Sequence, residues 1–191
     1  VQHQDPALDD DLATWQLENP PRPLIAVLGE PHVRAPGERP TSRVAWFTEI
    51  LVYLALHPAG VSQNKVLTDL WPDNNQVVVG TVRTSLSGAR RWAGRGLDGD
   101  PDRSFISDLN HDQTYRLRGH LLDYDLFRRL RKRAQARQAA HHPGAILDYQ
   151  AALRLVRGPV LFGLRPSGYA WLNNHDQRHD LQIPGYLVDT A

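Results

Sequence analysis

The chain contains no cysteine and no methionine, and only two of its 22 basic residues are lysines. The absence of cysteine excludes disulfides, thiolate nucleophiles and cysteine-ligated metal sites, and it fits a reducing cytoplasm. No apolar run approaches the roughly 20 residues that cross a bilayer, and no signal peptide opens the sequence. Because the chain starts at Val1 without methionine, we expect it to be part of a longer protein, with room for a membrane anchor in the remainder.

Charge is distributed unevenly, although the formal net charge is only +1. The first 22 residues carry five acids and one base, which leaves 21 basic and 16 acidic residues for the remainder. That excess allows local basic patches but not a polycationic nucleic-acid coat. Residues 19–23, NPPRP, form an extended spacer. We therefore interpret residues 1–22 as an acidic, proline-rich tail or linker, with a short helix near residues 9–17.

Residues 60–94 carry the clearest pattern in the chain, that of two helices joined by a short polar loop. Ser62 is a suitable N-cap for the first helix, because its hydroxyl can accept a hydrogen bond from an amide of the first turn. Pro72 ends this helix. Residues 71–76, WPDNNQ, have the composition of a loop, since such side chains bond their own backbone.

The second helix, over residues 77–93, combines an apolar face with a cationic one. Its valines, leucine and alanines recur at helical spacing, which predicts a buried stripe. The other face presents arginines and hydroxyl groups without any acid, as is typical of a helix in the major groove of DNA. The candidate DNA-contacting residues here are Thr81, Arg83, Thr84, Ser87, Arg90 and Arg91. The alternative is an ordinary amphipathic helix with a solvated cationic face.

The segments around this pair complete a known order of elements. The pattern predicts two strands joined by a turn over residues 24–28 and 32–35, followed by an apolar helix over residues 43–57. It predicts a hairpin over residues 103–109 and 114–118. Two strands, three helices and a hairpin are the order of a winged helix, in which the third helix contacts DNA and the hairpin is the wing.

Two arginines of the hairpin, Arg116 and Arg118, lie on its returning strand, where they could reach phosphates. The alternative is that the hairpin only closes the core, with Ile106, Tyr115 and Leu117 buried. The sequence alone leaves both interpretations open.

Several segments resemble known regulators. Those similar to the OmpR/PhoB-type winged helix are VLGE, LALHPAGVSQNKVLTDLWPD, TVRTSLSGARRWAG and TYRLRG. Residues 122–127 and the segment ALRLVRGPVLFGL resemble the bacterial transcriptional activator domain, as in Streptomyces antibiotic regulatory proteins. The segment PSGYAW resembles a variant in large actinobacterial membrane proteins that carry LysM domains.

The resemblance covers roughly residues 23–191 and implies an α+β winged helix-turn-helix domain over residues 23–119. An all-α, tetratricopeptide-like helical domain, part of an activator domain, is implied over residues 120–191. The implied function is a cytoplasmic DNA-binding transcriptional regulator, with no enzymatic activity and no cofactor. Double-stranded DNA is then the main partner, and a homodimer stays open. The residues implied to contact RNA polymerase or another partner are Trp71, Pro72, Asp73, Asn74, Asn75 and Gln76.

Two positions depart from the family pattern. Gly80 and Gly88 stand where OmpR/PhoB-type proteins commonly carry arginines that contact DNA. The loss of two cations predicts weaker or less specific binding, because each neutralised phosphate contributes to affinity. A glycine at position 88 also costs roughly 1 kcal/mol relative to alanine in a helix. Alternatively, Gly88 lets the DNA backbone or a partner helix approach closely.

Three helices are expected after residue 120. Asp123 is a candidate N-cap for a helix over residues 123–139. Pro143 suits the first turn of a helix over residues 143–156, and Ser167 is a candidate cap for a helix running to about Leu181. The residues expected to be buried in the second of these helices are Ile146, Leu147, Ala151 and Leu155.

Other signals leave further interpretations open. Six cations within residues 128–137 indicate a solvated face, an auxiliary phosphate-binding surface or a contact to an acidic partner. His175 and His179 have the i, i+4 spacing of a metalloprotease helix, but no third ligand is evident, and a metal hydrolase is the weakest hypothesis. The main alternative to DNA binding is a degenerate winged helix that acts as a protein-interaction module, as the cytoplasmic part of a membrane protein.

Overall fold

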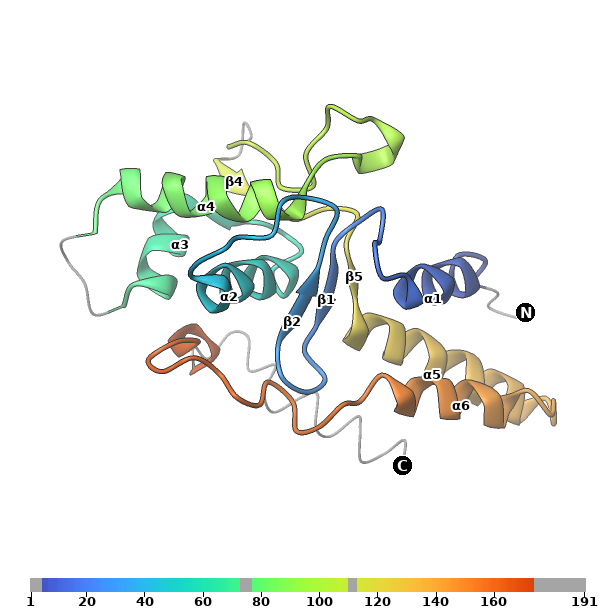
Figure 1. Ribbon diagram of the computed structural model, residues 1–191. Helices are drawn as coiled ribbons and strands as arrows, with labels where there is room; N and C mark the ends of the chain where they lie inside the picture. The colour runs from blue at the N-terminus through green and yellow to red at the C-terminus, as the bar shows by residue number, and fades with distance from the viewer. Residues whose placement is uncertain (1–4, 73–76, 110–112, 174–191) are drawn as a thin grey trace.

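The computed structural model describes residues 5–72, 77–109 and 113–173, which form a mixed α+β fold. The strands are β1 (Leu24–Ala26), β2 (His32–Arg34), β3 (Val61–Ser62), β4 (Thr114–Tyr115) and β5 (Leu121–Leu122). The helices are α1 (Leu8–Gln16), α2 (Val44–Ala55), α3 (Gln63–Leu70), α4 (Val79–Ala93), α5 (Asp123–Ala139) and α6 (Ala145–Arg154). Helices α2, α3 and α4 lie on one side of β1 and β2, and α5 and α6 on the other, with α1 beside α5 (Figure 1).

A three-stranded sheet in the order β2-β1-β5 lies at the centre. Strand β1 is antiparallel to β2 and parallel to β5, and Ile25 is the register partner of both Val33 and Leu122. The predicted pairing of β1 with β2 is confirmed. Strand β5 was not predicted, because two residues are too short for a recognisable pattern. It lies just beyond residue 119, so the sheet joins residues that the sequence assigns to two domains.

Helices α2, α3 and α4 form as the sequence predicts. Ser62 caps α3, its hydroxyl accepting a hydrogen bond from the Lys65 amide at 3.2 Å. The apolar stripe of α4 is buried, and Val82 and Ala89 are completely inaccessible to solvent. Since α2 contacts both β1 and α4, it forms the centre of this helical group.

The hairpin is less regular than predicted. Strand β4 pairs with β3 rather than with a continuous strand over residues 103–109, which is reduced to bridges at Ser104 and Ile106. The Ser104 hydroxyl accepts from the Ile106 amide and donates to the Gly94 carbonyl, so it satisfies backbone groups that a ladder would otherwise use. Ile106, Tyr115 and Leu117 are buried, so the hairpin does close the core.

Of the four residues predicted to be buried in helix α6, Leu155 is buried and Ala151 is half-buried, but Ile146 and Leu147 are not. Ile146 and Leu147 are 65% and 67% exposed, whereas Ala145, Asp148 and Ala152 are buried. The buried carboxylate of Asp148 accepts hydrogen bonds from Arg133 and Arg137 of α5, at 2.8 Å each. Ion pairing with the cationic helix α5, rather than the aliphatic side chains, therefore decides which face of α6 is covered.

The segment after α6 contains one short 3-10 helix, η2 (Ala170–Asn173). Ser167 has a φ of +57°, in the left-handed region, and begins no helix, so its predicted cap is wrong. The rest of the predicted helix to Leu181, including His175 and His179, lies outside the described residues. Within the described residues no helix is long and apolar enough to cross a membrane, and no group of three potential metal ligands occurs.

The acidic N-terminal segment is docked rather than a free linker. Leu8 of α1 is completely buried. Arg129 of α5 bonds to Asp5 and Asp11, each at 2.6 Å, and Arg133 bonds to Asp9 at 2.7 Å. Acids of the first eleven residues therefore neutralise part of the cationic run on α5.

Asp123 joins the sheet to α5. The amide of Val27 donates to both oxygens of its buried carboxylate, and the amide of Leu28 donates to Oδ2, each at 2.9 Å. Burial raises the pKa of Asp123 to about 6, while these amides and Arg157 act in the opposite direction. The predicted N-cap role is wrong, because Leu122 is the N-cap residue and Asp123 is the first residue of α5, with its side chain bound to the backbone that follows β1.

We expect Asp123→Asn to lower the free energy of unfolding by about 2–3 kcal/mol at pH 7.5. The amide has only one acceptor oxygen, so one buried N–H loses its partner. Chemical denaturation measures the difference. Asp125→Asn is the matched control, since Asp125 is exposed on the same helix and should change stability by less than about 0.5 kcal/mol. Equal effects of the two substitutions would contradict the assignment.

Candidate nucleic-acid interface

The outer face of α4 is exposed and carries no acid. Thr81, Arg83, Thr84, Ser87 and Arg91 are all exposed. Neither Arg83 nor Arg91 makes an ion pair or a side-chain hydrogen bond with any described residue. The Thr84 hydroxyl bonds back to the Gly80 carbonyl at 3.0 Å. Five of the six residues predicted on this helix thus share one accessible surface with two uncompensated guanidinium groups.

Arg90 has a different environment from its neighbours. Its Nε and Nη2 donate to the carbonyls of Ile106 and Ser107 at 3.1 and 2.7 Å, and its Nη1 lies 3.0 Å from the Asp108 carboxylate. Arg90 therefore holds the first arm of the hairpin against α4. Its charge is largely used inside the protein, which sequence spacing alone did not indicate.

The two hairpin arginines also differ. Arg118 is exposed, whereas Arg116 is half-buried with its side-chain stem against Gly60. A Cβ at Gly60 would lie 2.7 Å from the Cγ of Arg116, so only glycine allows this packing. Of the two arginines on the returning strand, Arg118 is consequently the one that is open to solvent for a phosphate contact.

The two glycines of α4 occupy opposite environments. A Cβ at Gly88 would lie 2.5 Å from the Phe47 ring of α2, whereas a Cβ at Gly80 would meet only Val78, at 3.9 Å. Gly88 therefore serves the close approach of α2 within this chain. An arginine at position 88 could not be accommodated without moving Phe47, so its absence has a packing reason. Gly80 is exposed and has no such reason.

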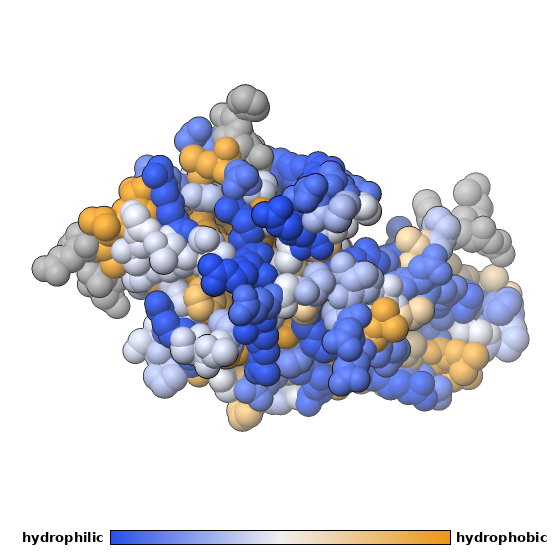
Figure 2. Space-filling model, turned by 45° about the horizontal axis from the view of Figure 1, so that its top comes forward, coloured by the Kyte–Doolittle hydropathy of each residue, from blue (hydrophilic) through white to orange (hydrophobic). Residues whose placement is uncertain are grey.

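The predicted loop begins from an aromatic contact. Trp71, the C-cap of α3, is half-buried, and its ring centroid lies 4.9 Å from that of Trp46 in an edge-to-face arrangement. Pro72 is exposed. Asp73, Asn74, Asn75 and Gln76 lie outside the described residues. At the other end of the loop, Val78 and Val79 are 65% and 40% exposed, where Figure 2 shows hydrophobic atoms beside the grey segment on the left.

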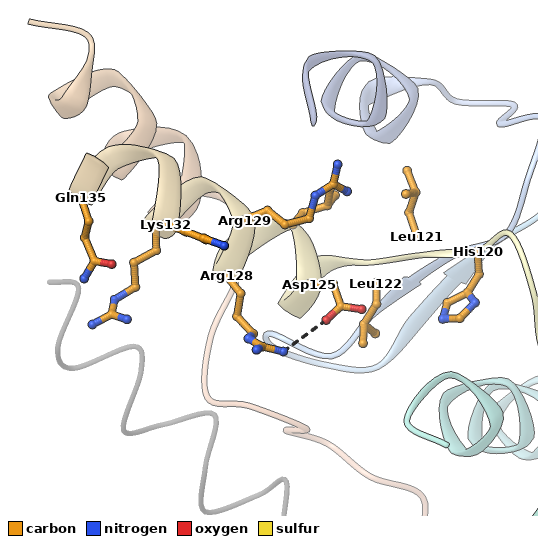
Figure 3. Close-up of a pocket in the computed structure, with 10 residues that line it drawn as sticks. His120, Leu121, Leu122, Asp125, Arg128, Arg129, Lys132 and Gln135 are labelled. Atoms are coloured by element: carbon orange, nitrogen blue, oxygen red, sulfur yellow. Dashed lines mark ion pairs between the residues drawn. The ribbon is translucent and has the colours of Figure 1, made fainter. Parts of the chain in front are cut away.

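Helix α5 lines a basic groove of about 490 Å³ at the edge of the sheet (Figure 3). Arg128 lies there 3.9 Å from Asp125, and Lys132 makes no ion pair with a described residue. Burial lowers the pKa of His120, at the far end, to about 4, so this imidazole is neutral. With Arg129, Arg133 and Arg137 bound by acids of the N-terminal segment and α6, the cationic run is partly a structural ion-pair network.

Glu49 is a buried acid that the sequence pattern did not single out. Glu49 of α2 is 1% exposed, and its carboxylate accepts from Arg165 Nε at 2.5 Å, the Tyr169 amide at 2.6 Å and the Trp171 indole at 3.2 Å. The sequence feature that could have indicated this role is that Glu49 is the single acid in an otherwise apolar helix. Such a group must find partners when it is buried.

The fold is similar to that of EmbR. The structure of Mycobacterium tuberculosis EmbR, determined in complex with a low-affinity phosphopeptide, matches with a TM-score of 0.63 and 21% sequence identity. The match covers 88% of this chain and 42% of the EmbR chain, so this chain corresponds to less than half of EmbR. No protein-family model and no curated protein matches the sequence. At this level of identity, the likeness to EmbR establishes the fold.

We expect Gly88→Ala to lower the free energy of unfolding by about 1–3 kcal/mol, because the added methyl group overlaps the Phe47 ring. Helix propensity alone favours alanine over glycine and would raise the free energy of unfolding. A decrease therefore indicates that the clash with Phe47 outweighs propensity. Gly80→Ala is the matched control and should stabilise the protein by roughly 0.5 kcal/mol. Phe47→Leu in the Gly88→Ala background should recover part of the loss. Thermal denaturation of the four proteins tests this, and a stabilising Gly88→Ala would refute it.

We expect Arg90→Ala to loosen the hairpin. The amides of Ser107 and Arg118, which donate to the carbonyls of Arg116 and Phe105 at 2.9 and 2.8 Å, should exchange with solvent at least tenfold faster. Hydrogen exchange measured by NMR detects this change. Arg83→Ala, on the same helix but with no hairpin contact, should leave both rates unchanged.

Proposed function

We propose that the chain is a DNA-binding transcriptional regulator, or the DNA-binding part of a larger one. In this proposal α2, α3, α4 and the hairpin over residues 103–118 act as a winged helix. Helix α4 lies in the major groove, which is wide enough for an α-helix. The observation that carries the proposal is the exposed face of α4, which has no carboxylate of its own and two arginines that pair with none of the described residues. The likeness to the EmbR fold and the resemblance of residues 60–94 to OmpR/PhoB-type proteins support it.

The proposal assigns different tasks to the cations. Arg83 and Arg91 contact phosphates or guanine edges, and Thr81, Thr84 and Ser87 supply short hydroxyl contacts. Arg118 contacts a phosphate from the wing. Arg90 and Arg116 position the hairpin. Because few cations are free, binding should be modest in affinity and should weaken steeply with salt.

We further propose that residues 120–173 begin a tetratricopeptide-like activator domain, since α5 and α6 form an antiparallel helical pair beside the sheet. The loop over residues 71–76 would then contact RNA polymerase. The Trp46–Trp71 contact supports this assignment by fixing one end of that loop on the core.

A protein-interaction module is the second candidate function. The exposure of Val78 and Val79 at the start of α4 favours it, because a partner protein would cover these side chains better than a phosphate backbone would. In that case the chain would not bind duplex DNA even at low salt.

Mobility shifts with random-sequence duplex DNA across a salt series test the two functions. Arg83→Ala and Arg91→Ala should each weaken binding about three- to tenfold at low salt and lower the salt slope by about 1. Arg154→Ala is the control, because Arg154 is exposed on α6, outside the proposed interface. Absence of any shift at low salt, or equal losses in all three variants, would overturn the DNA-binding proposal.

A further inference from the structure

A cavity of about 370 Å³ lies where the start of α2, the end of α3 and the segment after α6 meet. We call residues 165–169 the arm. The residues that line the cavity are Arg43, Trp46, Leu70, Trp71, Pro72, Arg165 and Ser167. No part of it belongs to the proposed DNA-contacting face of α4.

The arm is held in place by Glu49. This carboxylate binds Arg165 Nε and the Tyr169 amide, at the two ends of the arm. The arm therefore forms a fixed wall of the cavity, and its Arg165 guanidinium lies 4.8 Å from the ring centroid of Trp46.

The cavity wall is cationic. Among the described residues that line it are two guanidinium groups and no carboxylate. Arg165 is compensated by Glu49, but Arg43 makes no ion pair and no side-chain hydrogen bond with any described residue; its guanidinium lies 5.9 Å from the Trp46 ring. Helix α2 also begins here without a side-chain cap, so the positive end of its dipole adds to the two charges.

The cavity also has an aromatic wall. Trp46 and Trp71 meet edge to face in it. Trp46 is 7% exposed, and its indole N–H has no acceptor in the described part of the chain. Arg43 and Ser167 both have left-handed φ angles, +55° and +57°, an unfavourable backbone state that often accompanies binding sites.

We propose that this cavity binds a small organic anion, namely a carboxylate or phosphate monoester carried on a flat apolar body. Guanidinium groups recognise both anions by paired hydrogen bonds, and the half-buried indole of Trp71, packed against Trp46, provides the surface for a flat body. The volume lies at the lower end of the range for small-molecule sites. An occupied cavity would link the arm to Trp71 and Pro72, where the 71–76 loop begins. This regulatory consequence rests on the proposed function, whereas the binding itself does not.

The indole N–H signals of the five tryptophans in a ¹⁵N NMR spectrum provide the test, with Trp46 and Trp71 assigned by substitution to phenylalanine. Phenyl phosphate and benzoate are the probes, with benzyl alcohol as the uncharged analogue and inorganic phosphate as the anion without a ring. We expect phenyl phosphate or benzoate to shift the Trp46 and Trp71 signals saturably, leaving Trp15 and Trp92 in place. Benzyl alcohol should shift none of them.

Arg43→Gln should weaken this binding at least about tenfold, while Arg118→Gln, an exposed arginine elsewhere, should not change it. Unchanged Trp15 and Trp92 signals verify that the variants fold. No saturable shift, an equal effect of both variants, or equal shifts caused by benzyl alcohol would overturn the proposal. Mobility shifts with wild-type protein are unaffected by that outcome, so the two proposals fail separately.

Discussion

The backbone of Val27 and Leu28, at the end of β1, is the point on which the two helical groups depend. Both residues are completely buried, so each N–H and C=O needs an internal partner. The amides donate to Asp123 of α5, and the carbonyls accept from the amides of Leu161 and Arg157, at 3.0 and 2.7 Å. Two residues thus fix both the start of α5 and the segment after α6. The position of the helical pair is set by buried polar contacts rather than by a linker.

The basic side chains of α5 and those of α4 differ in how far acids of the chain neutralise them. This difference matters more for binding an external anion than the net charge does. On α5, Arg129, Arg133 and Arg137 are bound by acids of the N-terminal segment and of α6, so these three have little charge left to offer an external anion. On α4, Arg83 and Arg91 have no such partner. Only unpaired cations contribute fully to counterion release on DNA. A count of basic residues along the sequence therefore overstates the affinity that the chain can offer.

Patterns within a few residues of the sequence predicted helix caps and buried helix faces well. They failed where a residue far along the chain determines what a side chain binds. The Ser62 cap and the stripe of α4 depend on neighbours within a turn or two, and both are confirmed. Asp123 has the local signature of a cap, yet two amides 95 and 96 residues away bind it. Helix α6 has one face with Ile146 and Leu147 and another with Ala145 and Ala152. The second face is buried, because it also carries Asp148, which pairs with α5. From the sequence, Gly88 could be read as the loss of a DNA-contacting arginine. The structure shows that the Phe47 ring leaves no space for a side chain at this position.

Helix α2 connects the candidate interface to the cavity. One side of it meets α4 through Phe47 and Gly88, with no space for even a methyl group, so the two helices are closely packed at this point. The other side holds Glu49 and Trp46, which carry the arm and the cavity wall. A displacement of α2 by the arm would therefore be passed to α4 through the contact between Phe47 and Gly88. Trp71 offers a second route that bypasses α4, because it joins the cavity directly to the loop that follows α3.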